Sequence, residues 1–323
     1  MNTNQKTRIA IAGIGGIGGY IGGKLAYHYQ NSENVEILFI SRGETKKAID
    51  QQGLTLHSGD QTYNCVPSVN SDDPVLIGQI DALIICTKSY STTSILKEYA
   101  RCLQPNAVII TTQNTVNGQA SLADLLPKGI SLLEGCIFIA SNILQAGIIE
   151  HKPGPTKLFF GTNNLASKQG EAFEKLLQEA GIDTTFTQNI QEILWKKFLF
   201  VSPIAIVSAL TQLTFSQILE NEIHVTRFIQ LTSELIQLAQ VKHIPLDENA
   251  INNNVELLRK FNPTVKSSFQ LDLAKGNLSE IDSLISYVLT EAATHALKLP
   301  YYETAFIELC LKYPHINAQI DPL

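Results

Sequence analysis

The sequence predicts an α/β protein: a doubly wound, mostly parallel sheet domain followed by an all-helical domain. In the first half, short β-branched runs alternate with helical stretches, as at Arg8–Ala12, Val35–Ile40, Ala82–Cys86 and Ala107–Thr112. Such alternation is typical of parallel β-α-β units whose strands are buried on both faces. After about Thr187 no strand pattern remains, and apolar residues recur every three or four positions, which indicates helices.

We expect the domain boundary near residues 187–190, which gives an α/β domain over residues 1–188 and a helical domain over residues 189–323. A length of 323 residues suits two ordinary domains. The stretches "SLLEGCIFIAS" (131–141) and "GIIEHKPGPTKLFFG" (147–161) predict later strands of the first domain, the second folding as a hairpin around Pro153-Gly154. The helical domain is expected to begin with "IQEILWKKFLFVSPIAIVSALTQL" (190–213).

Composition excludes several classes of protein. The net charge of -6 argues against a nucleic-acid surface, which requires clustered Lys and Arg. The seven histidines show no ligand spacing, so no metal site is expected. The apolar run Phe198–Leu210 is too short to span a bilayer, and no membrane association is expected. An odd number of cysteines, five, with no C-x-x-C predicts reduced thiols and a cytoplasmic protein.

The opening stretch "RIAIAGIGGIGGYIGGK" (8–24) matches G-x-G-x-x-G in one frame, at Gly13, Gly15 and Gly18. A strand precedes these glycines and a helix follows, as the Rossmann-type dinucleotide fingerprint requires. Gly13 permits the turn, Gly15 lets the backbone approach a pyrophosphate, and Gly18 lets the helix pack close to the strand. We assign Gly13, Gly15, Gly16, Ile17 and Gly18 to the cofactor site. The glycines outside the fingerprint at 16, 19, 22 and 23 also suit close packing of the helix against the sheet.

The end of the second strand favours NADP(H) as the cofactor. NAD-selective sites carry an acidic residue there, but this strand ends in Ile40-Ser41-Arg42. Arg42 can hold a 2′-phosphate with its planar guanidinium, and Lys46 could assist. In the alternative interpretation Arg42 is a solvated loop residue and Glu44 holds the ribose of NAD.

Three further patterns follow predicted elements in order: Lys88 in "CTKS", Asn114 in "TTQNTVNG" and Lys197 in "EILWKKF". The stretch "SSFQLDLAKGNLSEID" adds Ser268 and, twelve residues on, Glu280. Together with the glycine fingerprint, this order resembles the ketopantoate reductase (2-dehydropantoate 2-reductase) family over nearly the whole chain. The resemblance implies an NADP-dependent oxidoreductase of pantothenate biosynthesis, which reduces a small 2-oxo acid, ketopantoate, to (R)-pantoate.

The resemblance also implies roles for individual residues. Lys197 is the general acid, and Glu280 is its partner and a cofactor contact; a protonated Lys both polarises a carbonyl and supplies a proton. Ser268 binds the substrate carboxylate, Asn114 positions nicotinamide and carbonyl, Lys88 contacts cofactor and substrate, and Ala140 contacts the cofactor through its backbone. Each also has a plain structural alternative: an amphipathic-helix lysine for Lys197, a helix cap for Ser268, a turn for Asn114 and a solvated loop for Lys88.

The sequence departs from the family pattern where substrate-facing asparagines are usual, since Val201 and Ala205 occupy those positions. Thr115 and Ser286 replace usual glycines, and Ser202 could supply a substitute hydroxyl if the helix register shifts. One alternative is therefore a D-2-hydroxyacid dehydrogenase for a bulkier branched or aromatic 2-oxo acid. Another is a non-catalytic NADP(H)-binding sensor. We expect the site between the two domains and regard the helical domain as a candidate for homodimer formation.

Overall fold

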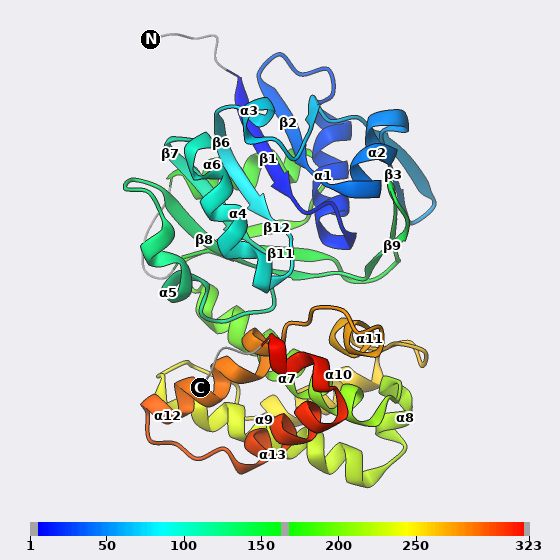
Figure 1. The fold of residues 1–323 in the computed structure, drawn as a ribbon, viewed down its shortest axis with the longest axis vertical. Helices are drawn as coiled ribbons and strands as arrows, with labels where there is room; N and C mark the ends of the chain where they lie inside the picture. Colours follow the sequence, from blue (N-terminus) through cyan, green and yellow to red (C-terminus); the bar gives the residue numbers. More distant parts are fainter. Residues whose placement is uncertain (1–5, 163–167, 320–323) are drawn as a thin grey trace. The chain divides into compact units, whose positions relative to one another are not determined.

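The computed structural model describes residues 6–162 and 168–319. The chain forms two compact units (Figure 1). The first consists of Met1–Gln113 with Asn117–Ile190, and the second of Asn114–Val116 with Gln191–Leu323.

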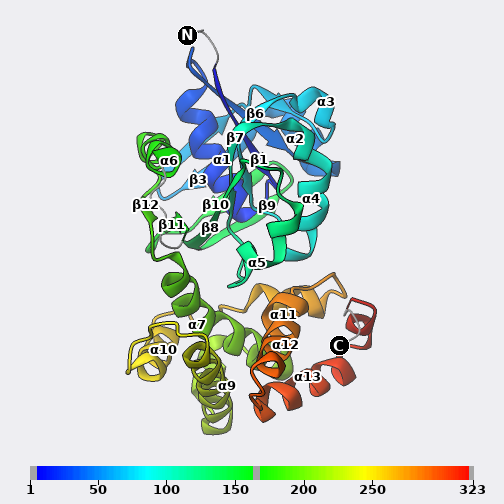
Figure 2. The same ribbon diagram turned by 90° about the vertical axis from the view of Figure 1, so that its left-hand side faces the viewer.

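The main sheet of the first unit has the strand order β12-β11-β8-β7-β6-β1-β2-β5 among the described residues. All neighbouring strands are parallel except β11 and β8, which are antiparallel. Helices cover both faces, so the predicted doubly wound sheet is confirmed (Figure 2). The strands are β1 (Thr7–Ala12), β2 (Val35–Ile40), β5 (Val69–Asn70), β6 (Ile80–Ile85), β7 (Leu103–Thr111), β8 (Ser131–Phe138), β11 (Lys157–Gly161) and β12 (Thr184–Thr187). The helices are α1 (Gly16–Tyr29), α2 (Gly43–Gln52), α3 (Pro74–Ile77), α4 (Thr92–Tyr99), α5 (Gly118–Leu122) and α6 (Lys168–Glu179).

Both faces of the central strands are buried, which explains their nearly continuous apolar sequences. In β1, Ile9 and Ile11 join an apolar cluster with side chains of α1 and α6. The alternate residues Ala10 and Ala12 join a second cluster with side chains of α3 and α4.

The carboxyl ends of four strands are aligned at one edge of this sheet. Ala12 of β1 pairs with Ile40 of β2 and with Ile85 of β6, and Ile85 pairs with Thr111 of β7. The chain passes from β1 to β2 and later returns to β6 on the other side of β1. Ligands of doubly wound folds bind at this kind of reversal, beyond the carboxyl ends of the strands.

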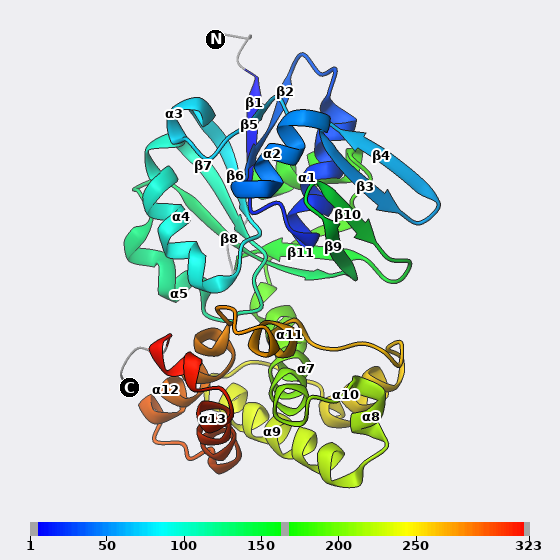
Figure 3. The ribbon, with the colours of Figure 1, turned by 45° about the vertical axis from the view of Figure 1, so that its right-hand side comes forward.

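A second sheet of the first unit has the order β4-β3-β10-β9. Its strands are β3 (Leu54–Ser58), β4 (Gln61–Cys65), β9 (Ser141–Gln145) and β10 (Ile148–His151), and none of the first-half strand predictions included β3 or β4. Helix α1 contacts β2 of the main sheet and β3, β4, β9 and β10 of the second (Figure 3).

The predicted hairpin around Pro153-Gly154 is wrong. Strand β10, before these residues, pairs with β3 and β9, whereas β11, after them, pairs with β8 and β12. The segment therefore carries the chain from one sheet to the other. Turn-forming residues specify a change of direction, but they do not specify which strands pair.

The extra glycines of α1 explain how this helix fits between two sheets. A Cβ added at Gly22 would lie 2.9 Å from the Phe39 ring of the main sheet, and one at Gly19 would lie 2.5 Å from Ile149 of the second. Larger residues would force the helix away from one sheet or the other. The interpretation of these glycines as packing positions is confirmed.

The second unit is helical in its described part. Its longer elements are α7 (Ile190–Thr211), α8 (Phe215–Leu219), α9 (Glu222–Val241), α10 (Ala250–Arg259), α11 (Ser268–Ala274), a π-helical turn (Asp282–Ser286), α12 (Tyr287–Thr294) and α13 (Pro300–Lys312). By length and composition α7 could cross a membrane, but 72% of its most apolar window is buried inside the protein. It is the core helix of this unit, with Trp195 and Ile206 fully buried.

A buried carboxylate joins α9 to α13. Glu234, only 3% exposed, accepts hydrogen bonds from the backbone N–H groups of Tyr301 and Tyr302, both at 2.8 Å. These N–H groups belong to the first turn of α13, where they have no partner within the helix. Burial raises the pKa of Glu234, and the two backbone hydrogen bonds oppose that rise.

Candidate active site

The glycine turn after β1 is held by backbone contacts. Gly13 has φ of +89° and donates its N–H to Ile40 O at 3.1 Å. A Cβ at Gly13 would lie 2.6 Å from the Thr87 side chain, and one at Gly18 would lie 2.0 Å from Gly13 O. The fold itself therefore requires glycine at positions 13 and 18.

Gly15 differs from its neighbours, because no protein atom requires a glycine there. Its φ of −94° is open to any residue, and an added Cβ would meet only Ile143 Cδ1 at an ordinary 3.9 Å. This open space adjoins the amino end of the 14-residue helix α1, whose N-cap is Gly15. Unpaired N–H groups and the helix dipole favour phosphate at such an end. The residues present therefore fit a dinucleotide pyrophosphate.

Gly16 and Ile17, also predicted as cofactor contacts, are in contact with the protein itself. A Cβ at Gly16 would lie 2.5 Å from Ser141 O, and the Ser141 hydroxyl donates to Gly16 O at 2.9 Å. Ile17 is partly buried against the core. Strand β9 thus holds the first turn of α1, a role for Ser141 that the sequence analysis missed because the two residues are 125 positions apart.

Arg42 follows β2 at the same sheet edge and forms an ion pair with Glu98 of α4, with Nη2 2.5 Å from Oε2. Lys46 pairs with Asp50 at 2.8 Å, and Glu44 pairs with Lys47 at 2.8 Å. The two residues proposed for a 2′-phosphate and the one proposed for an NAD ribose are thus all paired within the protein.

Lys88 and Ala140 complete the predicted residues of the first unit. Lys88 follows β6 directly after Thr87, which lies against Gly13 of the glycine turn. It precedes a short 3₁₀ turn, Ser89–Ser91, and is partly buried. Ala140 is exposed between β8 and β9, and its carbonyl accepts the backbone N–H of Lys152 at 2.8 Å. The structure therefore brings the glycine turn, Arg42 and Lys88 to one edge of the main sheet.

In the second unit, Lys197 lies on a partly exposed face of α7. Its neighbour Lys196 is exposed and pairs with Glu192 one turn earlier, at 2.6 Å. Val201 lies one turn after Lys197 on the same face and is also partly exposed, whereas Ala205 is 2% exposed. The accessible side chain beyond Lys197 on this face is therefore apolar.

Ser202 does not supply a substitute hydroxyl, which corrects that expectation. It is fully buried, donates to Leu284 O at 2.8 Å and lies 2.8 Å from the Tyr302 hydroxyl. Rotating it toward the Lys197 face would break both contacts. The hydroxyl serves to join α7 to the π-helical turn.

Glu280 is 5% exposed and lies two residues before the start of that turn. Its carbonyl accepts hydrogen bonds from the Ser283 hydroxyl at 3.1 Å and from the Leu284 N–H at 3.0 Å. Turns of π-helix occur frequently at functional sites because the extra residue redirects neighbouring side chains. Ser286, at a usual glycine position, is buried and donates to Asp282 at 3.2 Å.

Ser268 is not the cap of its helix. Ser267 caps α11 by accepting the Gln270 N–H at 3.1 Å, and its hydroxyl lies 2.7 Å from that of Ser208. Ser268 is exposed in the first turn, so the capping alternative applies to its neighbour.

Asn114 is partly buried and belongs to the second unit with Thr115 and Val116.

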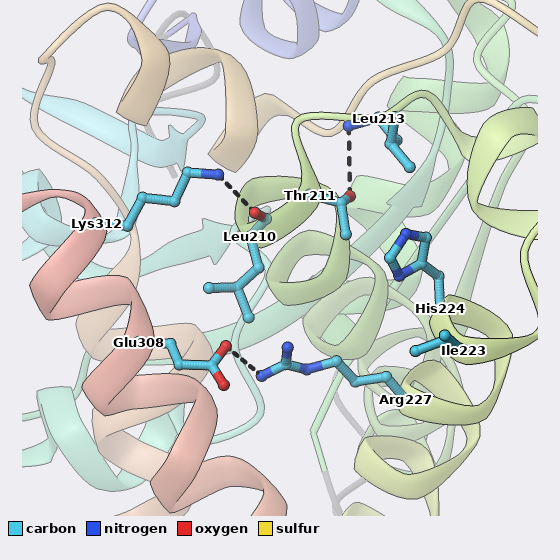
Figure 4. Close-up of a pocket in the computed structure, with 8 residues that line it drawn as sticks. All are labelled: Leu210, Thr211, Leu213, Ile223, His224, Arg227, Glu308 and Lys312. Carbon is cyan, nitrogen blue, oxygen red and sulfur yellow. Dashed lines mark hydrogen bonds and ion pairs between the residues drawn. The ribbon is translucent and has the colours of Figure 1, made fainter.

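A pocket of about 620 Å³ lies within the second unit, between α7, α9 and α13 (Figure 4). Two of its cations are engaged: Arg227 pairs with Glu308 at 2.7 Å, and Lys312 donates to Leu210 O at 2.5 Å. None of the predicted site residues lines it; the lining residues are Leu210, Thr211, Leu213, Ile223, His224, Arg227, Glu308 and Lys312. Within residues 6–162 and 168–319, no group of three or more His, Cys, Asp or Glu is arranged to hold a metal ion.

Comparison with known proteins identifies relatives along both units. The family model described as "Ketopantoate reductase PanE/ApbA" matches residues 9–164, and its C-terminal counterpart matches residues 189–309. The 2-dehydropantoate 2-reductase of Halobacterium salinarum is 23% identical over 92% of this chain and 96% of its own.

Solved structures share the fold. The crystal structure of a PanE/ApbA family ketopantoate reductase from Ralstonia eutropha JMP134 superimposes with a TM-score of 0.86 at 23% identity, covering 97% of this chain and 100% of its own. A ternary structure of D-mandelate dehydrogenase with NADH and anilino(oxo)acetate gives a TM-score of 0.83 at 19% identity, covering 96% and 100%.

Proposed function

The chain belongs to the ketopantoate reductase family and is an oxidoreductase; from this premise we propose that it reduces 2-dehydropantoate to (R)-pantoate, using NADPH and a proton from Lys197. The observation that carries the proposal is the open space at Gly15. Gly15 is a glycine that the fold does not require. It lies at the amino end of a helix, where a pyrophosphate binds favourably.

Residues at the edge of the main sheet would hold the cofactor. The first turn of α1 would receive the pyrophosphate, Arg42 the 2′-phosphate, and Lys88 would contribute a further positive charge near the glycine turn. When bound, NADPH supplies the hydride that reduces the carbonyl carbon.

Lys197 would act on the oxygen atom of the substrate carbonyl. Its ammonium group donates a hydrogen bond to the carbonyl oxygen, and it transfers a proton to that oxygen as the hydroxyl forms. The buried carboxylate of Glu280 would pair with the ammonium group of Lys197. Ser268 would bind the substrate carboxylate, and Asn114 would orient the carbonyl by hydrogen bonding.

A second candidate is a D-2-hydroxyacid dehydrogenase for a bulkier apolar 2-oxo acid. The partly exposed Val201, one turn from Lys197, favours an apolar substituent on the substrate. Ser202 is engaged inside the helical unit and offers no hydroxyl to the 4-hydroxyl of ketopantoate. A related fold is that of D-mandelate dehydrogenase, whose ternary structure contains NADH and anilino(oxo)acetate.

Steady-state turnover separates these functions. NADPH and NADH oxidation would be followed with ketopantoate, 3-methyl-2-oxobutanoate and phenylpyruvate. We expect Lys197→Ala to reduce kcat by about 10²–10⁴-fold, the usual contribution of a general acid. Lys196→Ala is the matched control, because it removes an adjacent lysine whose charge is paired with Glu192, and it should retain activity.

Each outcome selects one function. Ketopantoate turnover abolished by Lys197→Ala supports the leading proposal. Turnover confined to phenylpyruvate or the branched acid would support the second candidate. Tight NADPH binding without turnover of any acid would support a non-catalytic sensor and overturn both enzymatic proposals.

The five free cysteines are consistent with a reducing, cytoplasmic compartment for this reaction.

A further inference from the structure

The Arg42 side chain has an acidic partner from a different part of the first unit. Glu98 is the next-to-last residue of α4, 56 positions along the chain, and its Oε2 lies 2.5 Å from Arg42 Nη2. The side chains of Arg42 and Glu98 are 57% and 36% exposed, so both remain accessible to a ligand.

The position of Glu98 is fixed by its neighbour. Tyr99 is fully buried and donates its hydroxyl to Asp72 O at 2.9 Å, which anchors the last turn of α4 to the segment after β5. The backbone of Glu98 is therefore fixed beside Arg42 by the buried Tyr99. The ion pair thus depends on the packing of α4 and not only on two flexible surface side chains.

The other cations of this segment are paired as well. Lys46 contacts Asp50, which also accepts a hydrogen bond from Asn70 at 2.7 Å, and Lys47 contacts Glu44. Three cations and three carboxylates thus cancel in formal charge where the sequence alone suggests a basic site. A 2′-phosphate, with a charge of about −1.5 to −2, would have to share Arg42 with a carboxylate.

We propose that Glu98 is a specificity-determining residue that competes with the 2′-phosphate for Arg42 and so weakens the preference for NADP(H) over NAD(H). This inference rests on the proposed function, in which Arg42 receives the 2′-phosphate. A guanidinium presents five N–H donors in a plane, so Arg42 can bind a phosphate without leaving Glu98 entirely. Glu98 then occupies one donor and repels the phosphate. NAD(H) lacks this phosphate and is insensitive to Glu98.

The test is a calorimetric measurement of NADP⁺ and NAD⁺ affinity in the absence of turnover. Glu98→Gln keeps the shape of the side chain and removes its charge. We expect it to tighten NADP⁺ binding about two- to fivefold, the upper range for an exposed ion pair, and to leave NAD⁺ binding unchanged. The gain should shrink at about 1 M salt, where the screening length falls to about 3 Å.

Controls separate this inference from its premise. Glu171→Gln, an exposed acid in the first turn of α6, removes the same charge elsewhere and should change neither affinity. Arg42→Ala should weaken NADP⁺ binding selectively. If Arg42→Ala has no effect, the assignment of the 2′-phosphate fails and the inference fails with it.

If Arg42→Ala weakens NADP⁺ binding but Glu98→Gln does not tighten it, the inference alone is overturned. Weaker NADP⁺ binding in Glu98→Gln would also overturn it, since Glu98 would then orient Arg42 for the phosphate. Equal tightening of NADP⁺ and NAD⁺ would refute competition at the 2′-position.

Discussion

Alanine substitution can distinguish the glycines that the fold requires, Gly13 and Gly18, from Gly15, which we propose faces a ligand. Gly15→Ala and Gly18→Ala each add a single methyl group, three positions apart. At Gly15 the methyl group meets only Ile143 Cδ1, at 3.9 Å, whereas at Gly18 it lies 2.0 Å from the carbonyl oxygen of Gly13. The same chemical change should therefore have opposite consequences for stability and for binding.

For Gly18→Ala the backbone must move by more than about 1 Å to restore contact distance. Overpacking of this kind costs about 1–3 kcal/mol. For a unit of this size, each kcal/mol lowers Tm by about 2–4 °C, so we expect a fall of about 2–12 °C. For Gly15→Ala, the poorer cap costs up to about 1 kcal/mol and the stiffer unfolded chain returns about 0.4–1 kcal/mol, so Tm should hardly change.

The assay combines thermal unfolding without cofactor and calorimetric titration with NADP⁺. We expect Gly15→Ala to melt like the wild type and to bind NADP⁺ at least about tenfold more weakly, equivalent to about 1.4 kcal/mol. Wild-type affinity in Gly15→Ala would refute the assignment of the open space to the pyrophosphate. An unchanged Tm in Gly18→Ala would refute the steric argument.

Two further predictions concern a buried carboxylate and two thiols, of which Cys65 is buried and Cys86 partly buried. Glu234→Gln loses one of the two acceptors for the α13 amide groups, so calorimetric unfolding should show a loss of about 1–3 kcal/mol; Glu303→Gln, an exposed acid of the same turn, is the control and should cost less. Equal losses in the two variants would contradict the cap. Burial raises the pKa of the Cys65 and Cys86 thiols to about 12, whereas a thiol in the unfolded chain has a pKa of about 8.5. The unfolded chain releases these protons first, so stability should be full below that pH and decline above it. Tm measured across this range should decline less steeply in the Cys65→Ala, Cys86→Ala double variant, and an identical decline would contradict the prediction.

Local patterns were sufficient for the elements that carry the glycine turn. The strand predicted at Val35–Ile40 has those bounds in the structure, and the strand at Arg8–Ala12 begins one residue earlier. Continuous β-branched runs, followed by glycines and an apolar helix, are signals contained within a few residues. The same is true of the change to helices after β12.

Local sequence patterns could not predict which strands or side chains pair when they lie far apart in the chain. The sequence predicts a hairpin at Pro153-Gly154, but this segment joins two sheets. The sequence also offers Ser202 as a substrate contact, but its hydroxyl is bonded to Leu284 and Tyr302. The hydroxyl of a serine is equally suited to a ligand or to a buried carbonyl. Only its surroundings decide between them.

The sequence by itself determined the fold class, the change from an α/β half to a helical half and the position of the glycine turn, because these depend on periodicity and on residues adjacent in the chain. Tertiary structure alone decided which glycines serve packing and which leaves open space. It also paired Arg42 with Glu98, 56 residues away. Steric room and charge neutralisation depend on the distance between side chains in space, and sequence separation does not record that distance.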